Sequence, residues 1–414
     1  MTTVEARRPY AWLFRTPRTA ALLTGMTISA IGDGAAAVAL PLLALQLHGS
    51  LPAAVAIAAV AATAYIVPVA ISLSVGLGRR RFDPRAVLTI DAIARAAVFG
   101  VVGVLGVSGR LSLAAMIGLL LAGSGLRLLA STGRRLIVMA AAGSSGALAA
   151  NGVLGFVDSL ALFGIGPALG GLVSTVWSPS AALVLTASTY AVLAVTVAAL
   201  APRTPPTSTE PARSTSGWRV MRHARVVLLL LAVVFLFDLL YGPVEVALPL
   251  LVTVDLGRGA GTLGLAWAVF GVGAVISSAA TGALGRFRAV GVLIVIIVAW
   301  GSCDALLGAA PGAGVVIAVM GFGGLVYGPF TALAYTLLHR LVNRDDQAAV
   351  FAVWSGVLAL SLPIGLALGG PLVALAGTRM ALVIVGLLTV GLVPIAAAWL
   401  RRTGSGDPEP VVVP

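Results

Sequence analysis

Twelve apolar runs, each long enough to cross a bilayer, dominate this sequence. A membrane-spanning helix needs about 20 mainly apolar residues. Runs of that length lie between arginine, Gly-Ser and proline clusters, at residues 19–47, 52–77, 86–107, 111–131, 146–175, 180–201, 224–254, 262–284, 289–309, 312–338, 348–376 and 379–400. With 59% hydrophobic and 10% charged residues, the chain has more apolar sequence than a soluble interior holds. The sequence predicts an all-α membrane protein with twelve transmembrane helices.

A polar segment divides the twelve spans into two sets of six. The stretch "APRTPPTSTEPARSTSG" (201–217) is rich in Pro, Ser and Thr, and such a composition does not pack into a bilayer. The expected organisation is a six-helix bundle at 1–200, a cytoplasmic linker at 201–223, a second six-helix bundle at 224–400 and a cytoplasmic tail at 401–414.

Arginine placement predicts the orientation, because cytoplasmic segments carry an excess of basic residues. The chain has no lysine, so its 26 basic residues are all arginine. With both termini in the cytoplasm, 21 of the 26 lie in inner segments, three lie outside and two lie within spans. We therefore expect a multi-pass protein of the plasma membrane with both termini inside.

Short repeats relate the two halves. "VALPLL" occurs at 38–43 and 246–251, and "ALGG" at 168–171 and 367–370, late in the first and fifth spans of each half. Parallel six-helix repeats are how many secondary transporters are built. Pro41 and Pro249, inside the repeated hexapeptide, are expected to bend equivalent helices.

Several classes of function are disfavoured. The single cysteine, Cys303, excludes an internal disulfide and a thiolate metal cluster. Without lysine there is no Walker A loop and no Schiff-base enzyme. The arginines are scattered between apolar spans, so nucleic-acid binding is not expected. We predict no enzyme, no cofactor and no metal, and the expected partners are the lipid bilayer and a small-molecule substrate.

Ionisable residues inside spans mark a transport pathway or a paired structural site. Asp33 lies about 22 Å along the first helix from Arg18, at 1.5 Å per residue, and therefore deep in the bilayer. Gly32 and Gly34 flank it and keep side-chain bulk away. The two interpretations are proton coupling or substrate contact, and an acid permanently paired with an arginine.

Helix 7 carries two acids, Asp238 and Glu245. Their separation of two helical turns places them on one face. Either both line a cavity or they make polar packing contacts between bundles. Aligning the repeated hexapeptides leaves Tyr241 opposite Asp33, so the halves differ where polar chemistry is expected.

Other acids in spans have less specific signals. Asp91 and Arg95, at i and i+4, are expected to form a structural ion pair. Asp158 in the fifth span is a weaker cavity candidate, and Asp304, late in the ninth span, is expected near the external interface.

The chain resembles the major facilitator superfamily, and within it the macrolide-efflux and enterobactin-exporter-like branch. The motifs that carry the resemblance are "ISAIGDGAAAVALPLLAL" (28–45), "RRFDPRAVLTIDAIARA" (80–96), "LAANGVLGFVDSLALFGIGPALGG" (148–171) and "GFGGLVYGPFTALAYTLLHRLV" (321–342). The resemblance implies two six-helix bundles around a central cavity that opens alternately to each side of the membrane.

The resemblance also implies site residues. Asp33 matches the helix 1 "GD" of the family, and Arg127 of helix 4 is expected to face helix 1 and pair with Asp33. "GIGPALGG" (164–171) is similar to the helix 5 signature of proton-exchanging exporters, with Gly166, Gly170 and Gly171 allowing close helix packing and Pro167 allowing a bend.

The chain departs from the family pattern at the inner loops. Arg80 stands where members usually have an acid, the second-half loop (282–291) lacks an acid, and Ala349 stands where many relatives have arginine. The leading hypothesis is a monomeric, proton-coupled exporter of amphipathic small molecules such as drugs, antibiotics or siderophores. The alternatives are a metabolite importer or facilitator, and a transport-incompetent membrane scaffold or sensor.

Overall fold

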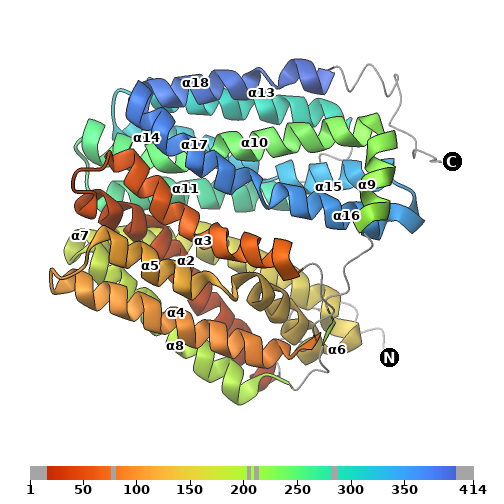
Figure 1. Cartoon of the computed structure of the whole chain (residues 1–414), viewed down its shortest axis with the longest axis horizontal. Helices are drawn as coiled ribbons and strands as arrows, with labels where there is room; N and C mark the ends of the chain where they lie inside the picture. The colour runs from red at the N-terminus through yellow and green to blue at the C-terminus, as the bar shows by residue number, and fades with distance from the viewer. Residues whose placement is uncertain (1–15, 76–80, 203–206, 209–213, 281–287, 398–414) are drawn as a thin grey trace. The chain divides into compact units, whose positions relative to one another are not determined.

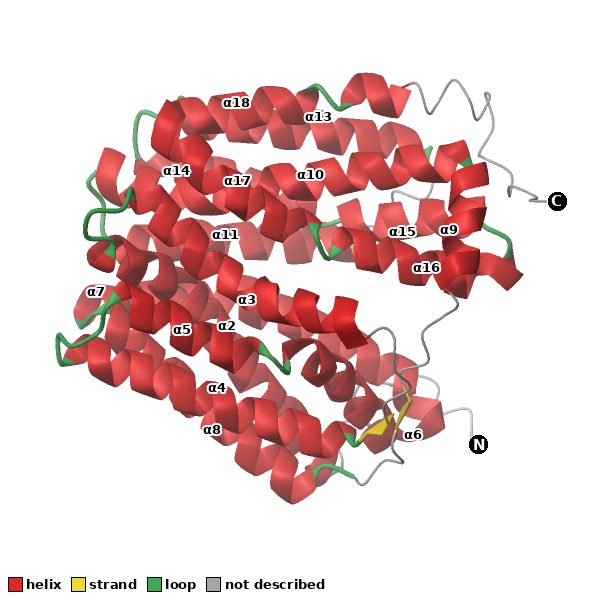
Figure 2. Cartoon of the chain, in the orientation of Figure 1, coloured by secondary structure: helices red, strands yellow, loops and turns green. Residues whose placement is uncertain are grey.

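The structure is a computed structural model that describes residues 16–75, 81–202, 207–208, 214–280 and 288–397. Within these ranges, eleven helical segments are long and apolar enough to cross a membrane, or twelve if one bent pair counts as a single span. Figure 2 shows helices through almost all of the described chain. The predicted twelve-helix, all-α membrane fold is confirmed.

The first half contributes these helices: α2 (Pro17–Leu47), α3 (Ala53–Val75), α4 (Pro84–Val107), α5 (Leu113–Ser124), α6 (Arg127–Ser159), a π-helical turn η2 (Leu160–Ile165), α7 (Gly166–Val176) and α8 (Pro179–Leu200). Two short strands, β1 (Arg81–Phe82) and β2 (Thr207–Ser208), pair antiparallel.

The second half begins with α9 (Ser214–His223), which lies in the predicted linker. It continues with α10 (Arg225–Leu250), the π-helical turn η3 (Leu251–Asp255), α11 (Ala260–Ala279), α13 (Ala289–Gly308), α14 (Ala313–Tyr327), α15 (Phe330–Leu341), α16 (Arg344–Leu358), α17 (Ser361–Ala376) and α18 (Thr378–Val390).

Local sequence signals set several helix starts. Asp83 and Ser178 precede α4 and α8, and each side chain accepts a hydrogen bond from a backbone N–H in the first turn. A proline follows each cap, where its missing N–H costs nothing. By contrast, Pro41 lies inside α2, and the helix continues past it to Leu47.

Two spans are broken near their middle. The axes of α5 and of residues 127–142 differ by 42°, so helix 4 is a bent pair. Helix 10 is interrupted between α14 and α15 at Gly328 and Pro329. Contrary to the predicted break before residue 146, α6 runs without interruption from Arg127 to Ser159.

The contacts divide the chain into two compact units. The first comprises residues 1–49, 63–209 and 259–268, and the second comprises 50–62, 210–258 and 269–414. These units follow the predicted halves except that residues 50–62 group with the second unit and residues 259–268 group with the first.

In the first unit, α2 packs against α6, α7 and α8, while α4 packs against α5, α6 and α8 (Figure 1). Glycine makes the α2–α7 approach possible. A Cβ on Gly166 would lie 2.5 Å from the Ile31 carbonyl oxygen, and one on Gly170 would lie 2.5 Å from that of Ala35. The glycines of "GIGPALGG" therefore do form a close helix contact, as predicted from their size.

In the second unit, α10 packs on α17 and α13 packs on α18. These contacts also run through small residues, with a Cβ on Gly369 falling 2.7 Å from the Pro243 Cα, and one on Gly301 falling 2.6 Å from the Gly386 oxygen. The linker helix α9 packs on α16, where Gly217 meets the backbone of Ala349. The position where relatives carry arginine is thus a helix-packing site here.

Replacing Gly170 with valine is expected to destabilise the first unit by about 1–3 kcal/mol, because the added carbons overlap the α2 backbone. The measurement is thermal unfolding of the purified protein in detergent. Gly118→Val is the matched control, since a Cβ there meets nothing within 4 Å. Equal melting temperatures for the two variants would contradict the packing account.

Candidate functional site

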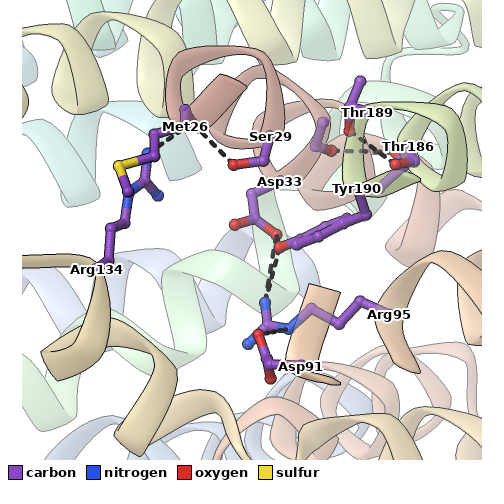
Figure 3. Close-up of polar contacts among 10 residues, drawn as sticks. Met26, Ser29, Asp33, Asp91, Arg95, Arg134, Thr186, Thr189 and Tyr190 are labelled. Atoms are coloured by element: carbon purple, nitrogen blue, oxygen red, sulfur yellow. Dashed lines mark hydrogen bonds and ion pairs between the residues drawn. The ribbon is translucent and has the colours of Figure 1, made fainter. Parts of the chain in front are cut away.

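Four side chains from three helices of the first unit form a polar cluster inside the bundle (Figure 3). The Tyr190 hydroxyl on α8 donates a hydrogen bond to Asp33 Oδ1 on α2 at 2.5 Å. Arg95 Nη1 on α4 donates to the Tyr190 oxygen at 2.8 Å and lies 3.7 Å from Asp33 Oδ1. Arg95 Nε forms an ion pair with Asp91 Oδ2 at 3.0 Å. We call these four residues the charge cluster.

The glycines beside Asp33 explain how α2 places this carboxylate between other helices. Gly32 faces α8, where the Thr189 side chain occupies the space that a Cβ would need. Gly34 faces η2 and α7, against Leu162 and Pro167. The Thr186 hydroxyl also donates to the Gly32 carbonyl at 3.0 Å. The two glycines thus let α7 and α8 approach α2 on either side of Asp33.

Burial increases from one end of the charge cluster to the other. The side chain of Asp33 is 28% exposed, that of Arg95 is 11% exposed and that of Asp91 is 4% exposed. Asp91 Oδ1 is buried without a hydrogen-bond partner among the described residues. Asp33 is therefore the accessible end of the cluster, and Asp91 is its closed end.

Aromatic contacts fix the middle of the cluster. The Arg95 guanidinium carbon lies 5.3 Å from the centre of the Tyr190 ring, which Phe99 stacks against at 5.9 Å. Tyr190 is 3% exposed. Packing on its ring holds the hydroxyl where it contacts both Asp33 and Arg95.

The structure pairs Asp33 with Arg95 rather than with the predicted partner Arg127. Arg127 is exposed at the start of α6, directly after the helix 4 bend, and its guanidinium lies 5.8 Å from the Tyr65 ring centre. The Asp91–Arg95 pair does form, as its spacing predicts, but it is not isolated, because Arg95 also reaches Asp33.

The helix 4 arginine that reaches α2 is Arg134. Its Nη2 donates a hydrogen bond to the Met26 carbonyl oxygen at 2.5 Å, and the Ser29 hydroxyl donates to the same oxygen at 2.8 Å. The predicted spans 111–131 and 146–175 leave Arg134 in an inner loop, because they do not include the continuous helix α6.

The remaining acids take varied positions. Asp238 and Glu245 are both half-buried on α10, consistent with a shared face. Asp158 lies on α6, but its side chain falls outside the described part of the chain. Their proposed roles, and the gating roles of Pro41, Pro249, Pro167 and Gly171, stay predictions.

Asp304 is fully buried in the second unit, one turn before α13 ends at Gly308, and neither carboxylate oxygen has a hydrogen-bond partner among the described residues. Its place near the external interface stays a prediction. It shares a helix face with Trp300, one turn earlier, and that ring is also buried. Because α13 packs on α14, α15 and α18, this face points into the unit. This helix therefore presents an acid to the interior of the unit.

An aromatic cluster occupies the second unit where the first has charges. Tyr241, Trp300 and Tyr327 contact one another, with ring centres 5.4 to 5.8 Å apart. Phe237, Phe270 and Phe330 pack around them. Trp354 and Tyr335 belong to a separate aromatic group with Phe351. Among the described residues no group of three His, Cys, Asp or Glu side chains is arranged to hold a metal ion.

Replacing Tyr190 with phenylalanine is expected to destabilise the protein by about 1 kcal/mol, because Asp33 and Arg95 both lose a hydrogen-bond partner. Unfolding in mixed detergent–SDS micelles measures this change. Tyr335→Phe, which keeps its ring stacking on Phe351, is the control. A Tyr190→Phe protein as stable as the control would show that the hydroxyl contacts contribute nothing.

The sequence model of the Major Facilitator Superfamily matches residues 230–412. No curated protein matches the sequence significantly. Transporter structures resemble the chain over almost its whole length. A mutant of the nucleoside transporter NupG has a TM-score of 0.70 and 14% identity, covering 92% of this chain and 99% of its own.

Two further transporter structures resemble the chain to a similar extent. A bacterial homologue of the iron transporter ferroportin, in an inward-facing state, has a TM-score of 0.70 and 15% identity, covering 92% of this chain and 98% of its own. A POT family transporter in complex with a thioalcohol-conjugated peptide has a TM-score of 0.66 and 12% identity, covering 92% and 96%. At these identities the likeness establishes the fold.

Proposed function

We propose that this chain, which has the major facilitator fold, is a membrane transporter that exports amphipathic small molecules in exchange for protons. The charge cluster is the proton-coupling site, and Asp33 is the group that gains and loses the proton. The observation that carries this proposal is that the partly exposed Asp33 contacts Arg95. Arg95 also pairs with a second, buried carboxylate, that of Asp91.

The charge balance of the cluster favours uptake of one proton. Asp33, Asp91 and Arg95 carry a net charge of −1 when both carboxylates are ionised, and no net charge after one proton is bound. Inside a membrane an unbalanced charge is costly. Arg95 is the counter-ion of both Asp33 and Asp91, so the cluster has no net charge only when one of the two carboxylates is protonated.

Accessibility assigns the proton to Asp33. Its side chain is 28% exposed, whereas that of Asp91 is 4% exposed and retains Arg95 as a neighbour at 3.0 Å. Protonation of Asp33 releases Arg95 to pair with Asp91 alone. This change alters the contacts that join α2 to α4 and α8, which is the kind of local event that biases a two-state transporter.

The direction of transport rests on the helix 5 residues. Gly166 and Gly170 bring α7 against α2 next to Asp33, so a proton-dependent change on α2 is transmitted directly to α7. The stretch is similar to the signature of proton-exchanging exporters. The arginine distribution supports a plasma-membrane protein with both termini in the cytoplasm, and we propose that it works as a monomer.

A two-stage experiment tests the proposed function. Cells that overexpress the protein are screened against antibiotics, dyes and siderophores for increased resistance. Each protective compound is then followed in everted membrane vesicles with and without a pH gradient. We expect uptake into the vesicles that stops when nigericin collapses the gradient. Uptake that persists unchanged after nigericin would reject proton exchange, and vesicles from cells with empty vector are the control.

A further inference from the structure

The linker helix α9 is amphipathic, and it packs on the second unit with one side only. Gly217 and Met221, one turn apart, are buried, and Gly217 meets the backbone of α16. Trp218, Arg219 and Arg222 are exposed on the opposite side, where spacings of three and four residues bring them together. We call these three residues the basic face of α9.

The helix α9 lies at the level where the chain enters the membrane. Only Ala224 separates the end of α9 at His223 from Arg225, where the membrane-spanning part of α10 begins. The backbone of Ala224 is not helical, with φ −93° and ψ 77°, so the chain turns at this residue. Figure 1 shows α9 lying across the end of α10 instead of continuing its axis. A helix in that position runs along the membrane surface.

Positive charge predominates around the basic face. Between residues 211 and 237 the sequence has four arginines and no acid. The neighbouring helix α16, on which α9 packs, adds one arginine and two aspartates in its first turn, namely Arg344, Asp345 and Asp346. The arginines of this surface therefore outnumber its acids, and a negatively charged partner is attracted to it.

We propose that the basic face of α9 binds the headgroups of anionic phospholipids at the membrane surface, on the side that the arginine distribution predicts to be cytoplasmic. Arg219 and Arg222 donate hydrogen bonds to the lipid phosphates. The Trp218 ring inserts at the boundary between headgroups and acyl chains, where tryptophan is enriched in membrane proteins. Basic segments next to a membrane span are attracted to anionic lipid in this way.

Two observations favour a lipid over a soluble acidic partner. The basic face is separated from the span by a single turn of the chain at Ala224, so headgroups surround it whenever the protein is in a membrane. In addition, Trp218 is 46% exposed beside two arginines. An exposed indole ring beside arginines suits an interface that is apolar on one side and charged on the other.

Native mass spectrometry of the purified full-length protein in detergent tests the proposal, because it resolves individual bound lipids. The protein is titrated with phosphatidylglycerol and with phosphatidylcholine that has the same acyl chains. We expect the wild type to bind phosphatidylglycerol more tightly. The double variant Arg219→Gln/Arg222→Gln is expected to reduce this preference about tenfold and to leave phosphatidylcholine binding unchanged. Trp218→Ala is expected to weaken both lipids.

A second double variant, Arg110→Gln/Arg258→Gln, is the matched control. It also removes two exposed arginines, but from loops that are predicted to lie on the other side of the membrane. It should retain the wild-type lipid preference. Arg219→Lys/Arg222→Lys preserves the charge and should retain most of the preference, which separates loss of charge from loss of folding. Melting temperatures verify that each variant is folded.

Three results would overturn the proposal. The first is equal affinity of the wild type for the two lipids, and the second is an equal effect of the two glutamine double variants. The third is displacement of phosphatidylglycerol by equal concentrations of glycerol phosphate or hexaglutamate, which would identify the basic face as a site for soluble anions or acidic proteins. Lipid binding is measured without substrate or pH gradient, so none of these results bears on proton exchange.

Discussion

Replacing Asp33 with asparagine is expected to abolish the dependence of export on the pH gradient. Asparagine has almost the same shape and can still accept the hydrogen bond from Tyr190, but it cannot bind and release the coupled proton. The variant should therefore fold, insert and bind substrate, yet fail to accumulate substrate in everted vesicles when a gradient is imposed. The measurement is initial uptake of a protective compound from the resistance screen, compared at equal protein levels.

The control for this variant is Asp345→Asn, which removes an exposed acid outside the charge cluster. It should retain gradient-driven uptake. Counterflow, the exchange of labelled for unlabelled substrate without a gradient, separates coupling from binding. We expect Asp33→Asn to retain counterflow. Gradient-driven uptake equal to wild type in Asp33→Asn would remove Asp33 from the coupling role.

Replacing Arg95 with leucine is expected to cause the largest loss of stability. Arg95 lies between two carboxylates, one of which, Asp91, is almost completely buried. Removing one partner of a buried ion pair leaves an uncompensated charge and costs about 3–5 kcal/mol. Reversible unfolding in mixed detergent–SDS micelles measures the free energy.

A double variant shows whether the charge causes that loss. Arg95→Leu combined with Asp91→Asn removes the buried charge together with its partner, so most of the lost stability should return. A purely steric role of Arg95 predicts the same loss with and without Asp91→Asn. Arg379→Leu is the control for loss of an arginine outside the charge cluster. The Arg379 guanidinium donates hydrogen bonds to the Gly308 and Ala310 carbonyl oxygens near the end of α13.

The broad architecture follows from local sequence properties. Span length, arginine placement and the polar linker each depend on the neighbouring residues alone, and they predict twelve helices in two sets. The Asp91–Arg95 pair is likewise local, because four residues make one helical turn. Asp33 stands out in the sequence because an acid deep in a membrane span, between two glycines, is costly unless it is paired or has a function.

The partners of Asp33 depend on how distant helices pack, and the sequence contains no local sign of that. Tyr190 is 157 residues from Asp33, and nothing in the α8 sequence distinguishes it from a packing aromatic. Arg95 was assigned only to Asp91, since an i, i+4 pair has no need of a third member. The resemblance implies an Asp33–Arg127 pair, but the structure places Arg127 exposed directly after the helix 4 bend, which the sequence does not reveal.

The two halves use equivalent positions for different chemistry. Gly103 contacts Ser180 and Val184 of α8, and Gly308 contacts Arg379 and Val383 of α18 in the corresponding way. Matching these glycines aligns Arg95 with Trp300, each eight residues before its glycine. The hexapeptide repeat aligns Asp33 with Tyr241. The pair of charges in one half is thus a pair of aromatic rings, 5.8 Å apart, in the other.

This divergence is consistent with one proton site rather than two. A symmetric pair of charge clusters would bind two protons, whereas Tyr241 and Trp300 have no carboxylate to offer. We therefore propose that one proton is coupled at Asp33.

Proton release coupled to substrate entry tests the central claim most directly. Everted vesicles are acidified inside, the gradient is followed with a pH-sensitive fluorescent dye, and a protective compound from the resistance screen is added. Exchange predicts that wild-type vesicles lose acidity on addition, and that Asp33→Asn vesicles do not. Substrate entry into wild-type vesicles without any loss of acidity would contradict proton exchange at the charge cluster.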